Sequence, residues 1–159
     1  MGKTIVPVDS TRAYTGISTA LPLETDDQDG HYALNKTLTQ AVLQNLRALF
    51  KTCPGERVWN PHFGIGLRNY LFDQDTSTTR INLDANIREQ VAKFIPIVRI
   101  VDLRINSPLN NPAVPSNQLS IDLLFTIGQS ELMGLTFESS EAGGGVISSS
   151  PTDILSLLR

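Results

Sequence analysis

The chain has 159 residues, with 40% hydrophobic residues, 18% charged residues and a formal net charge of −3. These values are typical of one globular domain with terminal tails. Lysine and arginine form no block, which argues against a direct nucleic-acid partner. No run of about 18 apolar residues is present, so we expect no membrane span. One cysteine and two scattered histidines supply no metal-ligand pattern, and no metal or cofactor is expected.

Residues 1–30 show no helical periodicity and are expected to form an extended N-terminal arm, with one short strand at residues 3–8. The arm ends in an acidic cluster of Asp26, Asp27 and Asp29. Its scattered apolar residues favour an arm that lies along a surface. A disordered terminus is the alternative.

A helix is predicted over residues 34–51, because apolar residues recur there at spacings of three and four. The apolar stripe consists of Leu34, Leu38, Ala41, Val42, Leu46, Leu49 and Phe50. Asn35 is one candidate for its N-cap, and a start nearer Asp29 is the alternative. Pro54 and Gly55 end the helix.

A second helix is predicted over residues 81–95, and Pro96 ends it because the residue before a proline is disfavoured in the α conformation. Its apolar stripe consists of Leu83, Ile87, Val91, Phe94 and Ile95. The polar segment 73–79 is suited to cap this helix. A short helical turn is expected at residues 66–72.

Three strands are predicted at residues 97–105, 119–127 and 132–137, because apolar and polar residues alternate there. They predict an antiparallel three-stranded meander with both main helices on one face. This is an α+β domain over residues 31–137. The second strand is expected in the middle. The third is expected at an edge without the lysine, arginine or proline that protect an edge from pairing.

Residues 138–150 are rich in glycine and serine, which is typical of a flexible linker. A short apolar piece follows it, with Ile154, Leu155, Leu157 and Leu158. About nine residues cannot hold a helix alone in water. Residues 138–159 are therefore expected to lie outside the folded domain as a linker and amphipathic tail.

The segment 52–73 is the densest in unusual residues, with prolines, glycines and aromatic side chains close together. Such a composition predicts a structured corner in which Trp59 and Phe63 are buried. Gly64 and Gly66 are expected to form a tight turn. Glu56 is expected to pin the corner, through an ion pair with a basic neighbour or a hydrogen bond from a backbone amide.

This segment resembles the signature of the sheath-initiator family, the small baseplate wedge proteins of contractile phage tails and related injection machines. The resemblance covers about residues 26–137 and includes the helices and strands that flank the segment. The matching positions are Pro54, Gly55, Glu56, Arg57, Pro61, Phe63, Gly64, Gly66, Leu67, Arg68 and, between the second helix and the first strand, Pro96.

One position departs from the family pattern. Members carry Glu-Pro-Arg where this chain has Ile95-Pro96-Ile97. Both charges are missing together, and replacing both members of a buried ion pair by apolar residues can be neutral or stabilising. We therefore expect a packing role for this position, and a family contact made through those charges is in doubt.

The resemblance implies a non-enzymatic structural protein of the virion tail baseplate, assembled in the host cytoplasm. It implies contacts with the tail sheath protein, with other wedge proteins, and with tail tube or hub proteins. The sheet would accept an extended arm of the first sheath ring by strand addition. The unprotected third strand supplies the candidate residues Met133, Gly134, Leu135, Thr136 and Phe137.

Two other functions stay open at this point. Family members have also been labelled lysozyme-like, and a cell-wall glycosidase would use Glu56 with Asp73 or Asp75 as a second carboxylate. The adjacent Arg57 argues against this chemistry, because a nearby guanidinium keeps a carboxylate ionised. An adaptor in a bacterial contractile injection system is the other alternative.

Overall fold

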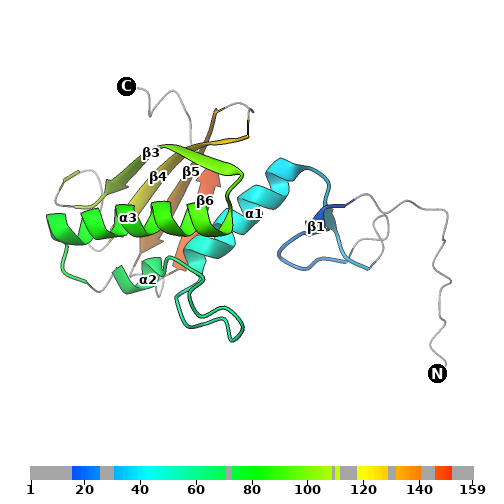
Figure 1. The fold of residues 1–159 in the computed structure, drawn as a ribbon, viewed down its shortest axis with the longest axis horizontal. Helices are drawn as coiled ribbons and strands as arrows, with labels where there is room; N and C mark the ends of the chain where they lie inside the picture. The colour runs from blue at the N-terminus through cyan, green and yellow to red at the C-terminus, as the bar shows by residue number, and fades with distance from the viewer. Residues whose placement is uncertain are drawn as a thin grey trace. The chain divides into compact units, whose positions relative to one another are not determined.

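The computed structural model describes residues 16–25, 31–70, 73–108, 110–111, 118–128, 132–140 and 146–151. These residues form an α+β fold of helices and antiparallel sheets, as the sequence predicts (Figure 1). The chain divides into two compact units, Met1–Gln44 and Asn45–Arg159. The strand predicted at residues 3–8 and the apolar tail after residue 151 lie outside the described residues.

The first unit contains a small antiparallel sheet of β1 (Ser18–Thr19) and β2 (Leu34–Asn35). Gln44 joins this sheet to the first half of helix α1. Its Oε1 accepts hydrogen bonds from the Leu21 amide and from Asn35 Nδ2, both at 2.9 Å, and its Nε2 donates to the Thr19 carbonyl. One amide side chain thus fixes both strands of the unit.

Helix α1 spans Leu38–Lys51 and begins four residues later than predicted. Thr37 and Gln40 explain the difference. The Gln40 amide donates to Thr37 Oγ1 at 3.2 Å, and the Thr37 amide donates to Gln40 Oε1 at 3.3 Å. This reciprocal pair is a capping box, which satisfies amides that would be unpaired at a helix start. Asn35 is therefore not the N-cap; it lies in β2.

The second unit contains the short helix α2 (Leu67–Tyr70) and the long helix α3 (Ser77–Phe94). Thr76 caps α3 by accepting a hydrogen bond from the Thr79 amide at 3.1 Å. The predicted cap segment therefore does cap the helix, which begins four residues earlier than predicted. The helix ends before Pro96, as predicted.

The main sheet is a meander in the order β3-β4-β5-β6, with all neighbours antiparallel. Its strands are β3 (Val98–Asn106), β4 (Gln118–Ile127), β5 (Leu132–Ser140) and β6 (Val146–Pro151). Strand β4 lies between β3 and β5, as predicted. Across these three strands Leu123 is opposite Leu103 and Leu135, which places an apolar row on one face.

Strand β6 corrects the sequence prediction at the C-terminal side. Residues predicted to be a linker extend β5 to Ser140 and form β6, which pairs with Leu135–Ser140 of β5. Backbone groups make this ladder, so it does not require the alternating apolar pattern by which strands are predicted. Consequently β5 is an inner strand over Leu135–Ser140 and not the expected edge.

The core of the second unit lies against the main sheet. Helix α3 lies across this sheet and contacts β3 (Figure 1). Near the end of α1, Phe50 stacks on Phe137 of β5 with ring centroids 3.9 Å apart. Beyond these contacts, the placement of both helices on one face stays a prediction. The largest fully buried side chains are Phe50, Phe125, Phe137, Leu46, Leu49, Ile65, Leu67, Leu83, Ile87, Ile121, Leu123 and Leu135.

Candidate functional site

The signature segment forms a closed loop between α1 and α2 (Figure 1). Its two ends meet at the last turn of α1, where the Ile65 amide donates to the Leu49 carbonyl and the Gly66 amide to the Thr52 carbonyl, each at 3.0 Å. These bonds satisfy carbonyl groups that a helix leaves unpaired at its C-terminus. We call residues 52–66 the signature loop.

Two glycines permit the loop to close. Gly64 has a φ of +114°, and a Cβ there would lie 2.3 Å from the Thr52 carbonyl oxygen. Gly66 has a φ of +69°, and a Cβ there would lie 2.8 Å from Cδ of Pro54. Both conformations favour glycine. The predicted tight turn is not observed, because the amides of Gly64, Ile65 and Gly66 donate to Gln90, Leu49 and Thr52 and not within the segment. Close backbone packing explains the two glycines.

Gln90 of α3 anchors the loop backbone from the other side, a role that the sequence pattern did not predict. Its Oε1 accepts a hydrogen bond from the Gly64 amide at 3.3 Å, and the residue is buried. The available signal was a polar residue three positions after Ile87, on the buried side of the helix. A buried polar side chain needs a partner, and here the partner is the loop backbone.

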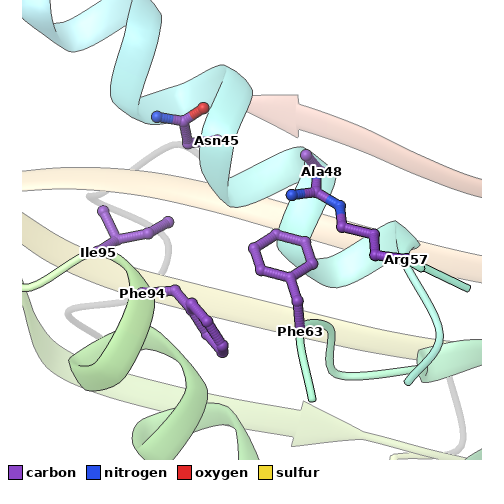
Figure 2. A pocket seen from close by; sticks show the side chains of 6 residues that line it. All are labelled: Asn45, Ala48, Arg57, Phe63, Phe94 and Ile95. Carbon is purple, nitrogen blue, oxygen red and sulfur yellow. The ribbon is translucent and has the colours of Figure 1, made fainter. Parts of the chain in front are cut away.

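Phe63 is buried, as predicted, and makes two ring contacts (Figure 2). The Phe63 ring packs edge to face on the Phe94 ring, with the two centroids 5.0 Å apart. The Arg57 guanidinium lies over the Phe63 ring, with its Cζ 3.7 Å from the ring centroid. Such a cation–π contact holds a charged side chain against an apolar surface. A cavity of about 220 Å³ is lined by Asn45, Ala48, Arg57, Phe63, Phe94 and Ile95.

Glu56 pins the loop through the backbone. Its Oε2 accepts a hydrogen bond from the Cys53 amide at 2.9 Å, which confirms the backbone-amide alternative. Arg57 is instead engaged by Phe63. Burial raises the pKa of the Cys53 thiol, and the nearby Glu56 charge raises it further. The thiol is consequently less reactive than an unhindered one, because the thiolate is the nucleophilic form.

Trp59 contradicts the prediction that both aromatic residues of the loop are buried. It is 99% exposed, and its neighbour Val58 is 90% exposed. The reason is local: the Asn60 amide donates to the Arg57 carbonyl at 3.2 Å, which makes Val58 and Trp59 the two central residues of a turn. Side chains at the tip of a turn project from the loop, so composition alone did not predict their exposure.

Glu56 does not have the surroundings of a glycosidase general acid. A general acid of that class is kept protonated by an apolar site, whereas Glu56 is exposed and accepts an amide hydrogen bond. Asp75 forms an ion pair with Arg80 at 3.3 Å. Among the described residues no group of three or more His, Cys, Asp or Glu could hold a metal ion. No helix in the described part is long and apolar enough to cross a membrane.

The position that departs from the family pattern is only partly a packing position. Ile95 is buried and lines the cavity beside Phe63, as expected. Ile97 is 42% exposed, and its carbonyl accepts a hydrogen bond from the Gly128 amide at 3.1 Å. The pair therefore does not lie together in the core. Pro96 is exposed in the turn between them.

The remaining signature residues separate into one core residue and a surface group. Leu67 is fully buried at the start of α2. Arg68 beside it is exposed. Pro54, Gly55 and Pro61 are exposed in the loop itself, and the Pro61 carbonyl accepts a hydrogen bond from the Gly55 amide at 2.8 Å. The signature thus combines a buried anchor with a surface loop.

The five sheath-interface candidates lie on β5 in different surroundings. Leu135 and Phe137 are buried, and Thr136 donates a hydrogen bond to Asp122 Oδ1 at 2.7 Å. Met133 and Gly134 are half-buried and lie beyond the end of β6, whose Pro151 is opposite Leu135. The structure therefore leaves the beginning of β5, and not its whole length, without a strand on that side among the described residues.

Comparisons with known proteins agree with this architecture. A family model described as baseplate wedge protein gp25 matches residues 36–131. No curated protein matches the chain. A chain of the anti-feeding prophage (AFP) baseplate, solved by cryo-EM, is 24% identical with a TM-score of 0.59; the match covers 71% of this chain and 86% of that chain. A putative tail lysozyme from Geobacter sulfurreducens is 17% identical with a TM-score of 0.49, and the match covers 75% and 91% of the two chains. Because the family model spans more than half of the sequence, the chain belongs to the family of the baseplate wedge protein gp25.

Proposed function

We propose that this protein is a non-enzymatic component of a contractile-tail baseplate wedge and that it templates the first ring of the tail sheath by strand addition. Its partners are the sheath protein and other wedge proteins, with tail tube or hub proteins as further candidates. Assembly takes place in the host cytoplasm. The same role fits a phage tail and a related injection machine.

The observation that carries the proposal is the incomplete cover of β5. The strand runs from Leu132 to Ser140, but β6 pairs only with Leu135–Ser140. Three residues, Leu132–Gly134, therefore have β4 on one side and no strand among the described residues on the other. An uncovered strand segment offers backbone donors and acceptors to an incoming chain. Gly134 has no side chain, which lets a second backbone approach closely.

The composition of β6 supports a larger contact. It reads Val-Ile-Ser-Ser-Ser-Pro and follows a run of three glycines. Serine packs little apolar surface and proline donates no hydrogen bond, so this strand binds β5 weakly for its length. A sheath arm that begins at Leu132–Gly134 could displace β6 and continue along Leu135–Phe137. In this proposal β6 occupies the site until the sheath arrives.

The opposite edge of the sheet is protected, which favours β5 as the acceptor. Strand β3 has a bulge between Ile100 and Asp102, and Val101 is the extra residue. Asp102 and Arg104 form an ion pair at 3.0 Å along the same strand. Bulges and charged side chains are the usual means by which proteins prevent pairing at an edge.

A reversible disulfide between β5 and β6 tests the proposal. Thr136 and Ser150 are opposite each other within the stretch to be displaced, so cysteines at both positions meet the spacing for a disulfide. The variant is made with Cys53→Ser so that no other thiol competes. Baseplates carrying the oxidised variant should fail to start sheath polymerisation, as scored by electron microscopy, and reduction should restore it.

The matched control places a disulfide elsewhere in the same sheet. Arg99 and Thr126 are opposite each other in β3 and β4 and do not restrain β6. The oxidised control should polymerise sheath like the unmodified protein. The proposed displacement is wrong if the β5–β6 disulfide also permits normal sheath growth. Normal sheath growth with Met133→Glu would contradict the proposal that the sheath arm first binds the beginning of β5.

A further inference from the structure

The tip of the signature loop presents two large apolar side chains to solvent. Trp59 and Val58 have the largest exposed fractions of the large apolar residues in the described part of the chain. The others with high exposure reach 68% at most, at Ile81. Water contact over a whole indole ring is unfavourable, and large exposed aromatic residues are characteristic of protein interaction sites.

The turn that carries these side chains is held rigidly. The Arg57–Asn60 hydrogen bond closes the turn, and the Gly55–Pro61 hydrogen bond of 2.8 Å closes the loop beneath it. The Glu56 carboxylate ties the same loop to the Cys53 amide. A partner therefore meets side chains whose backbone is already ordered, which lowers the entropic cost of binding.

The segment that carries the tip is basic although the whole chain is acidic. Residues 51–68 contain Lys51, Arg57 and Arg68 and only one acidic residue, Glu56, a formal charge of +2 with His62 neutral. All four charged side chains belong to exposed residues. The whole chain has a formal charge of −3. An acidic partner surface is therefore complementary to this part of the molecule.

We propose that the Val58–Trp59 turn is an anchor that inserts into an apolar pocket of another baseplate protein, with aspartate and glutamate residues around the pocket. The indole ring would supply most of the buried area, and Lys51 and Arg68 would face the acidic rim. This surface is separate from the sheath contact on β5. Only the choice of a baseplate protein as partner rests on the proposed function; the contact itself does not.

Two other occupants fit the charges and the geometry less well. A symmetric contact with a second copy would bring two basic surfaces together, which is unfavourable. A membrane surface usually binds a long amphipathic face, whereas this tip offers two apolar side chains on one turn. Both remain outcomes of the test, because each predicts a distinct response of Trp59.

Trp59 is the only tryptophan of the chain, so intrinsic fluorescence reports on this residue alone. The free protein should show the emission of a water-exposed indole and strong quenching by acrylamide. A blue shift with rising protein concentration would indicate self-association. A blue shift with phosphatidylglycerol vesicles would indicate membrane insertion. Either result would overturn the proposed partner.

The binding experiment uses purified wedge complexes that lack this protein and full-length chain labelled at its N-terminus. Trp59→Ala should weaken binding about 30-fold or more, as expected for a central aromatic anchor. Lys51→Glu with Arg68→Glu should slow association and reduce its salt dependence. Val101→Ala is the matched control, because Val101 is also an exposed apolar residue but lies on β3; its affinity should change less than about 2-fold.

The substitutions at the tip should leave the melting temperature unchanged, because neither side chain packs against the core. Equal affinity of Trp59→Ala and the unmodified chain would overturn the proposal. This outcome is distinguishable from failure of the sheath contact. The β5–β6 disulfide should leave wedge binding intact and block only the sheath, whereas Trp59→Ala should reduce wedge binding itself.

Discussion

At the scale of single residues, Glu56 shows how a charged side chain can stabilise the backbone of a loop. Its carboxylate accepts the Cys53 amide and fixes the loop that carries Trp59. Hydrogen bonds to a charged acceptor are stronger than neutral ones, but exposure to water reduces their net value. We expect Glu56→Gln to lower the free energy of unfolding by about 1 kcal/mol, measured by urea denaturation.

The control for this substitution is Glu89→Gln, which makes the same chemical change at an exposed position of α3. It should alter stability by less than about 0.5 kcal/mol. Equal effects of the two substitutions would show that the Cys53 amide does not need the Glu56 carboxylate. Hydrolysis of purified peptidoglycan by the unmodified protein, lost in Glu56→Gln, would contradict the structural role of this residue.

Cys53 reports on the same contact through its reactivity. Burial raises the pKa of the thiol, and the charge of Glu56 raises it further. Removing that charge lowers the pKa, so more thiolate is present at a given pH. At pH 8, iodoacetamide should therefore react faster with Glu56→Gln than with the unmodified protein, and Glu89→Gln should not change the rate. A slower reaction in Glu56→Gln would contradict the assigned cause.

Several single-residue roles could be predicted from the sequence, and others could not. The need for glycine at positions 64 and 66 and the burial of Phe63 follow from local rules, because backbone conformation and side-chain size act over a few residues. The exposure of Trp59 depends on which residues occupy the centre of the turn, and Gln90 finds its partner 26 residues away. Such details depend on tertiary geometry and not on composition.

At the scale of elements, the stacked pair Phe50–Phe137 holds the end of α1 against β5. Both residues are buried, so truncating one leaves a cavity. Phe50→Ala should reduce the free energy of unfolding by about 3–5 kcal/mol. A double-mutant cycle with Phe137→Leu should give a coupling of about 0.5–1.5 kcal/mol. Additive effects would contradict a direct contact between the rings.

Strand β6 leads to a different expectation for the C-terminal region than the composition alone suggested. Deleting residues 143–159 removes the ladder on Leu135–Ser140 and exposes an inner strand. A cost of about 1–2 kcal/mol corresponds to a fall in melting temperature of about 3–8 °C for a domain of this size. The truncated protein should also aggregate more readily. An unchanged melting temperature would indicate that these residues form a linker and tail outside the folded domain.

Elements with a strong periodic pattern were predicted well, and those without one were not. The stripe of α3 and the alternation of β4 indicated the correct elements because burial of one face imposes both patterns. The predicted start of α1 was wrong. The apolar spacing extends back to Leu34, whereas the capping box of Thr37 and Gln40 sets the start of the helix. Strand β6 shows no alternation of apolar and polar residues, and its pairing with β5 is made by backbone hydrogen bonds.

At the scale of the whole molecule, the chain combines a packed α+β domain with two surfaces that its own described residues leave incomplete. One is the beginning of β5, where the ladder with β6 stops at Leu135. The other is the exposed Val58–Trp59 turn. In the proposed function, partners in the baseplate would complete the strand and cover the ring.

A cryo-EM map of the assembled baseplate with the first sheath ring attached would test strand addition on β5. We expect this chain to lie in the wedge, with an extended segment of a sheath subunit paired along β5 from Leu132 to Phe137 and with β6 displaced from Leu135. A map in which β6 keeps its position and the beginning of β5 faces solvent, while the sheath starts on another protein, would contradict this expectation.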